Sequence, residues 1–62
     1  MNKFKIGDQV GRIGGLVPDY MLRGVITNVV EGPDSFKGYE VTFSNRMIAI
    51  FYEMQLRLVL AQ

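Results

Sequence analysis

The fold is decided by residues 38–59, which read GYEVTFSNRMIAIFYEMQLRLV. At the start of this stretch, Tyr39, Val41 and Phe43 alternate with polar side chains, which is the two-residue period of a half-buried antiparallel strand. Residues 47–52 are apolar at every position, so both faces of this next strand require cover. The stretch therefore predicts two neighbouring strands that carry more apolar side chains than one small core can bury.

Short connections surround these two strands. Ser44, Asn45 and Arg46 predict a tight hairpin in which Asn45 adopts the left-handed conformation. Residues 53–56 fit a single 3₁₀ turn, and residues 57–60 predict a last short strand. The chain after residue 38 is thus expected to contain three strands and one helical turn.

The first half of the chain predicts two further strands. Residues 9–13 form the first, and residues 22–30 form a second that is rich in β-branched side chains and has Gly24 as a bend or close backbone approach. Residues 14–20 and 31–38 hold the glycines, prolines and aspartates of two long loops. We expect an all-β fold in one domain, residues 1–62: a small five-stranded barrel with one 3₁₀ turn before the last strand.

Length and composition favour association. A domain of 62 residues buries only roughly 60% of the surface that its unfolded chain exposes, so its core is thin. The chain has no cysteine and no histidine, which excludes a disulfide and a thiolate or imidazole metal site. Contact with further copies or with a partner is the remaining means of stabilisation, and we expect a homo-oligomer. No apolar run approaches the ~20 residues of a membrane span, and a cytoplasmic location is expected.

Four short motifs carry a resemblance to a known class of fold. They are Phe-x-x-Gly-Asp-x-Val at 4–10, Gly-x-Ile-x-x-Val at 24–29, Tyr-x-Val-x-Phe at 39–43 and Phe-Tyr-Glu-x-x-Leu at 51–56. In this order they resemble the Src-homology-3-like (SH3-like) small barrels of bacteria and their mobile elements, a group that includes Tudor-like and ribosomal barrels. The likeness covers nearly the whole chain, and it implies a fold rather than an activity.

Residues 49–52 are also similar to the Val-Gln-Ile-Tyr pore strand of the type II dihydrofolate reductases of plasmids and integrons. Those enzymes are tetramers of small barrels whose central pore binds a nicotinamide cofactor and a folate. Ile50 stands here at the glutamine position, and Tyr52 matches the tyrosine. The pore lysine of that family would fall at Arg12 or Ile13. The resemblance implies an oligomer, with Tyr52 as the pore residue if the activity is present.

Two loop aromatics are candidates for ligand contact. Tyr20 and Phe36 lie in the two long loops, which flank one groove in barrels of this type, and Arg23 and Lys37 are polar anchors beside them. Such a groove binds peptides or stacks bases. The loops around these residues are the expected contact surface for a protein or peptide partner.

The apolar strand at 47–52 predicts the oligomer interface. Met47, Ala49 and Phe51 share one face, while Ile48 and Ile50 share the other with the tyrosine that follows. With the two isoleucines in the core, Met47 and Phe51 form an exposed stripe that monomers seldom leave uncovered. The core expected on this basis contains Val10, Val25, Ile26, Val29, Tyr39, Val41, Phe43, Ile48, Ile50, Leu56 and Leu58.

The remaining polar residues give little support to catalysis or to nucleic-acid binding. The carboxylates lie mostly in turns or on polar strand positions, so no catalytic residue, metal or cofactor is expected. A net charge of +1, with dispersed lysines and arginines, predicts only weak binding to nucleic acid. The expected function is a non-enzymatic binding or adaptor module that self-associates through its fourth strand. The alternatives are a reductase-like pore enzyme and a weak nucleic-acid-binding barrel.

Overall fold

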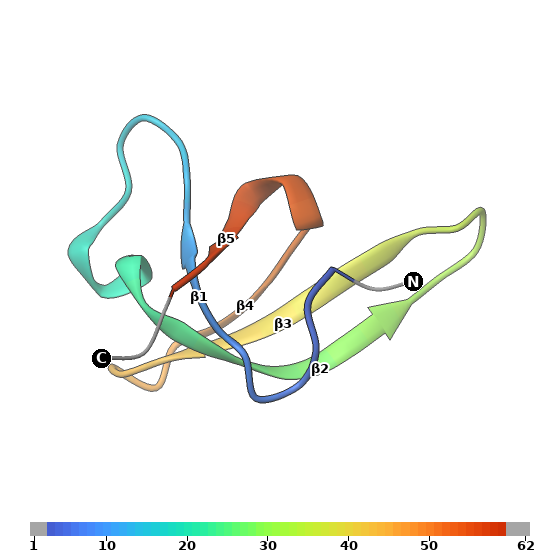
Figure 1. Ribbon diagram of the computed structural model, residues 1–62, viewed down its shortest axis with the longest axis horizontal. Coiled ribbons are helices and arrows are strands. Elements are labelled where there is room, and N and C mark those ends of the chain that lie inside the picture. Colours follow the sequence, from blue (N-terminus) through green and yellow to red (C-terminus); the bar gives the residue numbers. More distant parts are fainter. Residues whose placement is uncertain (1–2, 60–62) are drawn as a thin grey trace.

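A computed structural model describes residues 3–59 and shows an all-β chain with five antiparallel strands in one sheet (Figure 1). The elements are β1 (Gln9–Arg12), η1 (Asp19–Leu22), β2 (Gly24–Glu31), β3 (Lys37–Phe43), β4 (Ile48–Phe51), η2 (Glu53–Gln55) and β5 (Leu56–Leu58). The five strands and the 3₁₀ turn before the last strand, η2, confirm the fold class predicted from the sequence. A second 3₁₀ turn, η1, begins in the expected loop and ends at Leu22, so β2 starts two residues later than predicted. The η1 turn starts after Pro18, whose carbonyl accepts a hydrogen bond from the Met21 N–H at 2.9 Å.

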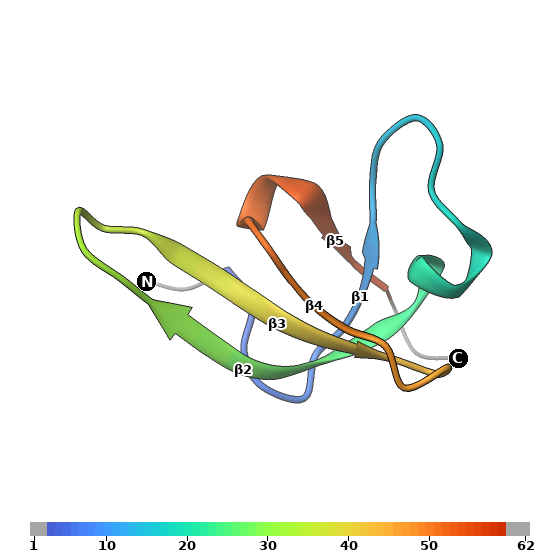
Figure 2. The ribbon, with the colours of Figure 1, turned by 180° about the vertical axis from the view of Figure 1, so that it is seen from behind.

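The strands follow the order β4-β3-β2-β1-β5, so the first and last strands of the chain are neighbours. Figures 1 and 2 show β2 and β3 as one long, curved hairpin that extends beyond the other strands. The sheet is curled, as a contact between two strands that are not neighbours shows. The guanidinium of Arg12 in β1 lies 4.8 Å from the centre of the Phe51 ring in β4. In a flat sheet these strands would be three spacings, about 14 Å, apart.

Curvature in β2 comes from a bulge rather than from Gly24. The pairing of β2 with β3 shifts between Ile26 and Asn28, which leaves Thr27 as the extra residue. Gly24 makes the close approach that the sequence predicts: a Cβ there would lie 2.6 Å from Cγ1 of Val41. The glycine therefore leaves room for the core, and the bend follows three residues later.

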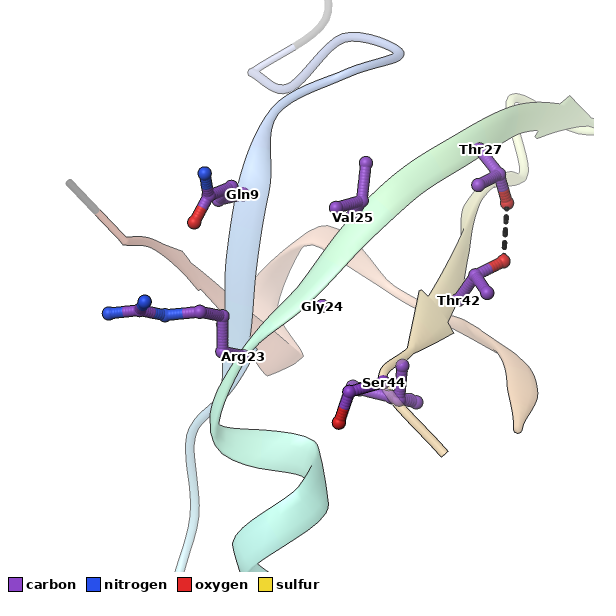
Figure 3. A pocket seen from close by; sticks show the side chains of 8 residues that line it. Gln9, Arg23, Gly24, Val25, Thr27, Thr42 and Ser44 are labelled. Carbon is purple, nitrogen blue, oxygen red and sulfur yellow. Dashed lines mark hydrogen bonds between the residues drawn. The ribbon is translucent and has the colours of Figure 1, made fainter. Parts of the chain in front are cut away.

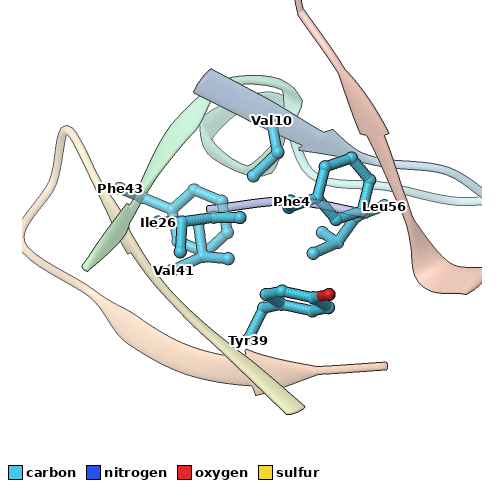
Figure 4. Packing of buried hydrophobic residues seen from close by; sticks show 7 residues of the cluster. All are labelled: Phe4, Val10, Ile26, Tyr39, Val41, Phe43 and Leu56. Carbon is cyan, nitrogen blue, oxygen red and sulfur yellow. The ribbon is translucent and has the colours of Figure 1, made fainter. Parts of the chain in front are cut away.

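Seven side chains form the core (Figure 4). They are Phe4, Val10, Ile26, Tyr39, Val41, Phe43 and Leu56. Phe4 comes from the segment before β1 and meets Tyr39 edge to face, with ring centres 5.3 Å apart. It is turned under the sheet by a bend in which the Lys5 N–H donates to the Asp8 carboxylate and the Asp8 N–H donates to the Lys5 carbonyl, both at 3.0 Å. Phe4 was missing from the predicted core, whereas Ile6, two residues further on, is exposed.

Six residues of the core are those predicted, but four predicted members are wrong. Val25, Ile48, Ile50 and Leu58 are exposed, and Val29 is only partly buried. The register explains the error in β4: Val41 lies opposite Ala49, and Val41 points inward. Directly opposed residues share a face, so Ala49 points to the core and the two isoleucines point outward. Alternation alone cannot choose between two apolar faces.

Among residues 3–59, three residues other than glycine have positive φ angles, and all three lie in hairpins. Asp34 and Ser35, at φ 57° and 64°, link β2 to β3, and the Phe36 N–H donates to the Pro33 carbonyl at 3.0 Å. Positive φ at both central residues is the feature of a type I′ turn, whose preferred sequence is Asn-Gly. In the β3–β4 hairpin the left-handed residue is Arg46, at φ 69°, and not Asn45 as predicted.

Asn45 has a different role because its side chain caps the turn. Its Oδ1 accepts a hydrogen bond from the Met47 N–H at 3.0 Å. The Arg46 N–H donates to the Phe43 carbonyl, and the Phe43 N–H donates to the Met47 carbonyl, both at 2.9 Å. The loop is three residues long, and in such loops the left-handed residue is the last one.

Substitution of two valines on paired strands tests which face of the sheet is buried and which is exposed. We expect Val41→Ala to lower the free energy of unfolding by about 2–4 kcal/mol, since it leaves a cavity among buried side chains. The same change at Val25, which points outward, should cost less than about 1 kcal/mol. Urea unfolding followed by circular dichroism measures both. Equal losses would show that the faces are assigned incorrectly.

The β2–β3 turn provides a second test. Ser35→Gly removes the steric cost of a left-handed residue, and we expect it to raise the free energy of unfolding by about 0.5–1 kcal/mol. Ser35→Ala is the matched control, because it removes the hydroxyl and keeps the Cβ. A stability gain in the alanine variant equal to that in the glycine variant would contradict the backbone explanation.

Candidate functional site

An exposed apolar surface lies on β4. This strand is at one edge of the sheet, and within the described residues its single strand partner is β3. Ile48 and Ile50 point away from the core and are 60% and 53% exposed. Two large aliphatic side chains therefore lie next to each other on the outer face of one short edge strand.

Tyr52 and Phe36 extend this surface. Tyr52 follows β4 and meets Phe36 edge to face, with ring centres 5.4 Å apart at 79°. Gly38 lies beneath the group, since a Cβ there would lie 2.7 Å from Cγ2 of Ile50 and 3.3 Å from Cζ of Phe36. A pocket of about 140 Å³ opens between Phe36, Ile50, Phe51 and Tyr52. We call Phe36, Ile48, Ile50 and Tyr52 the β4 face.

The inner side of β4 is already occupied. Ala49 and Phe51 are partly buried and pack against the core, while Met47, just before the strand, is exposed. The Phe51 ring lies 6.2 Å from that of Phe43 and beneath the guanidinium of Arg12. The Nε of Arg12 is buried without a hydrogen-bond partner among residues 3–59, and the guanidinium makes a cation–π contact with the Phe51 ring. An apolar stripe on this strand is present, but Ile48 and Ile50 form it in place of Ala49 and Phe51.

Tyr20 and Phe36 do not flank one groove. Tyr20, in η1, is half-buried and meets Phe43 edge to face at 5.6 Å between ring centres. Phe36 lies before the other end of β3, a strand of seven residues and therefore roughly 20 Å long. Figure 1 shows η1 and the tip of the β2–β3 hairpin at opposite ends of the molecule. Lys37 stays beside Phe36 and lies 3.9 Å from the Glu31 carboxylate.

Arg23 belongs to a separate and wider hollow of about 470 Å³ on the outer side of β1, β2 and β3 (Figure 3). Its lining consists of Gln9, Arg23, Gly24, Val25, Thr27, Thr42, Phe43 and Ser44. The hydroxyls of Thr27 and Thr42 lie 3.1 Å apart, and the Thr27 hydroxyl also donates to the Glu40 carboxylate. From the sequence only Arg23 was singled out here. The outward polar positions of β2 and β3 were the available signal for the others.

The described part of the chain offers no arrangement for metal binding. Within residues 3–59, no three acidic side chains gather in a way that could hold a metal ion. The same residues contain no helix that is both long and apolar enough to cross a membrane. The side chains gathered on the β4 face are hydrocarbon and phenol groups, which are suited to contact with another apolar surface.

Comparison of the chain with protein-family models, with curated proteins and with solved structures found no match.

The aromatic pair of the β4 face can be measured by a double-mutant cycle. With Phe36→Leu, Tyr52→Leu and the double variant, we expect a coupling of about 0.5–1.5 kcal/mol in the free energy of unfolding. The cycle of Phe36→Leu with Tyr20→Leu is the control and should give a coupling near zero. Strong coupling between Phe36 and Tyr20 would contradict the placement of these rings at opposite ends of β3.

Proposed function

We propose that this protein is a small, non-enzymatic binding module that self-associates through the β4 face. The observation that carries the proposal is the exposure of Ile48 and Ile50, side by side on an edge strand. A fully buried isoleucine side chain contributes about 1.5–3 kcal/mol relative to an exposed one. Ile48 and Ile50 are already about half covered, so burying the remainder contributes roughly half of this for each, and Tyr52 and Phe36 beside them add further apolar area.

The thin core supports the same proposal. Only seven side chains are fully buried among the described residues, and the chain has no cysteine with which to form a disulfide. Association stabilises the folded state by mass action, because the unfolded chain does not present the interface. A self-associating module of this kind would act in the cytoplasm, where proteins without disulfides are common.

A reductase-like pore has less support. Ile50 replaces the glutamine of that family and is part of the β4 face. The guanidinium of Arg12, near the position of the pore lysine, lies over Phe51 on the inner side of the sheet. Tyr52 alone matches the family motif and is exposed. Hydrophobic association uses all of the residues on the β4 face, whereas a reductase pore uses only one of them.

Nucleic-acid binding also has less support. The net charge is +1, and two of the seven basic side chains, Lys5 and Lys37, lie within 4 Å of carboxylates. Binding to a polyanion depends on the number of phosphate contacts, which a dispersed and partly paired set of cations keeps low.

The mass of the protein in solution tests the proposal. We expect the wild-type chain to form oligomers at micromolar concentration and Ile50→Glu to be a folded monomer, because a carboxylate cannot be buried in an apolar interface without a partner. Val25→Glu adds the same charge to an outward position on β2 and should remain oligomeric. Analytical ultracentrifugation with circular dichroism measures mass and folding together. A wild-type monomer at all concentrations would refute self-association.

A further inference from the structure

If the chain self-associates as proposed above, the backbone of β4 indicates how the two copies meet. We propose that two copies pair their β4 strands edge to edge and antiparallel, about a twofold axis at Ala49, so that the two sheets become continuous. The partner surface is then the same strand of a second copy.

The hydrogen-bonding groups of the edge are open. The Phe43 N–H donates to the Met47 carbonyl at 2.9 Å, so this is a hydrogen-bonded pair of the β3–β4 ladder. Such pairs alternate with non-hydrogen-bonded ones, and therefore Ala49 and Phe51 point their backbone groups to β3. The N–H and C=O groups of Ile48 and Ile50 point away from the sheet. None of them has a hydrogen-bond partner elsewhere in residues 3–59.

Nothing in the sequence of β4 blocks this edge. Natural edge strands usually carry a charge, a proline or a bulge that prevents pairing with another chain. Residues 47–52 contain no charge and no proline, and the pairing of β4 with β3 has no shift in register. The strand is thus a suitable template for strand addition, in which main-chain hydrogen bonds contribute to affinity.

Charges at the two ends of the strand set the direction. Arg46 precedes the apolar stretch and Glu53 follows it, and neither side chain forms an ion pair within the described residues. In an antiparallel pair, Arg46 of each copy comes near Glu53 of the partner subunit, twice by symmetry. A parallel pair would place like charges together. Opposite charges at the ends make the strand complementary to itself in the antiparallel direction.

When the two β4 strands are centred on Ala49, the free N–H and C=O groups of Ile48 and Ile50 all find partners. Ile48 then lies opposite the partner's Ile50, and Ile50 opposite the partner's Ile48. Each of these two pairs exchanges two hydrogen bonds, which gives about four across the interface. The four isoleucines lie on one outer face of the joined sheet, where cross-strand neighbours with Cβ atoms about 5 Å apart cover part of each other.

Charge reversal tests this arrangement. We expect Arg46→Glu alone and Glu53→Arg alone each to weaken self-association about tenfold at low salt, because each places like charges at both ends of the interface. An equimolar mixture of the two variants should restore association, since the heterodimer then has an opposite-charge pair at each end. Arg57→Glu changes a charge on β5, the other edge of the sheet, and should leave association unchanged. Sedimentation velocity measures each dissociation constant.

Backbone hydrogen exchange provides the second readout. On association, the amides of Ile48 and Ile50 should become protected, whereas that of Ala49 is already paired to β3. Edge pairing would be overturned if the protein formed oligomers in which these amides stay unprotected and the mixture of the two charge variants does not regain association. Self-association through the side chains of the β4 face would still hold in that case. A wild-type monomer overturns both proposals, and the edge would then be open to a strand of a different protein.

Discussion

The structure depends on one row of side chains, Tyr39, Val41 and Phe43, which point inward from β3 and are fully buried. Tyr39 holds Phe4 beneath the sheet, and Phe43 contacts both Tyr20 from η1 and Phe51 from β4. Segments from the start, middle and end of the chain therefore meet on a single strand. Because aromatic rings supply most of this row, the contacts have a defined edge-to-face geometry as well as a large buried area.

A sheet of one layer can bury only one of its faces against itself. Once the row on β3 faces inward, the register sends Ala49 and Phe51 inward too, and the isoleucines of β4 point to solvent. The second apolar face of β4 thus has no cover within the described chain. Folding of the single chain does not require isoleucine at these two exposed positions. Threonine or lysine at positions 48 and 50 would still allow β4 to form and would expose less hydrocarbon to water.

Much of this fold could be predicted from the sequence because alternation in β3 and the turn residues are local signals. The strand count, the 3₁₀ turn before β5 and six core residues follow from them. The orientation of β4 could not be predicted, since Met47 to Tyr52 offers two apolar faces and the choice is made by pairing with Val41. The resemblance to small barrels implied that Tyr20 and Phe36 flank one groove, but Tyr20 lies beside Phe43 at one end of β3 and Phe36 precedes the other end. The hollow around Arg23 combines residues from three strands, and no local pattern marks it.

The pairing of β1 with β5 has a consequence for the folding pathway. The β2–β3 hairpin closes over a turn between Glu31 and Lys37, whereas Val10 and Leu58 are about fifty residues apart in the chain and still lie opposite each other. Loop closure costs more entropy for distant residues, and folding slows as contacts become less local. We expect the hairpin to form early and the β1–β5 ladder last. Until that ladder closes, the inner surface and the edge of β4 are exposed together, so the nascent chain is most vulnerable to misassembly just before folding is complete.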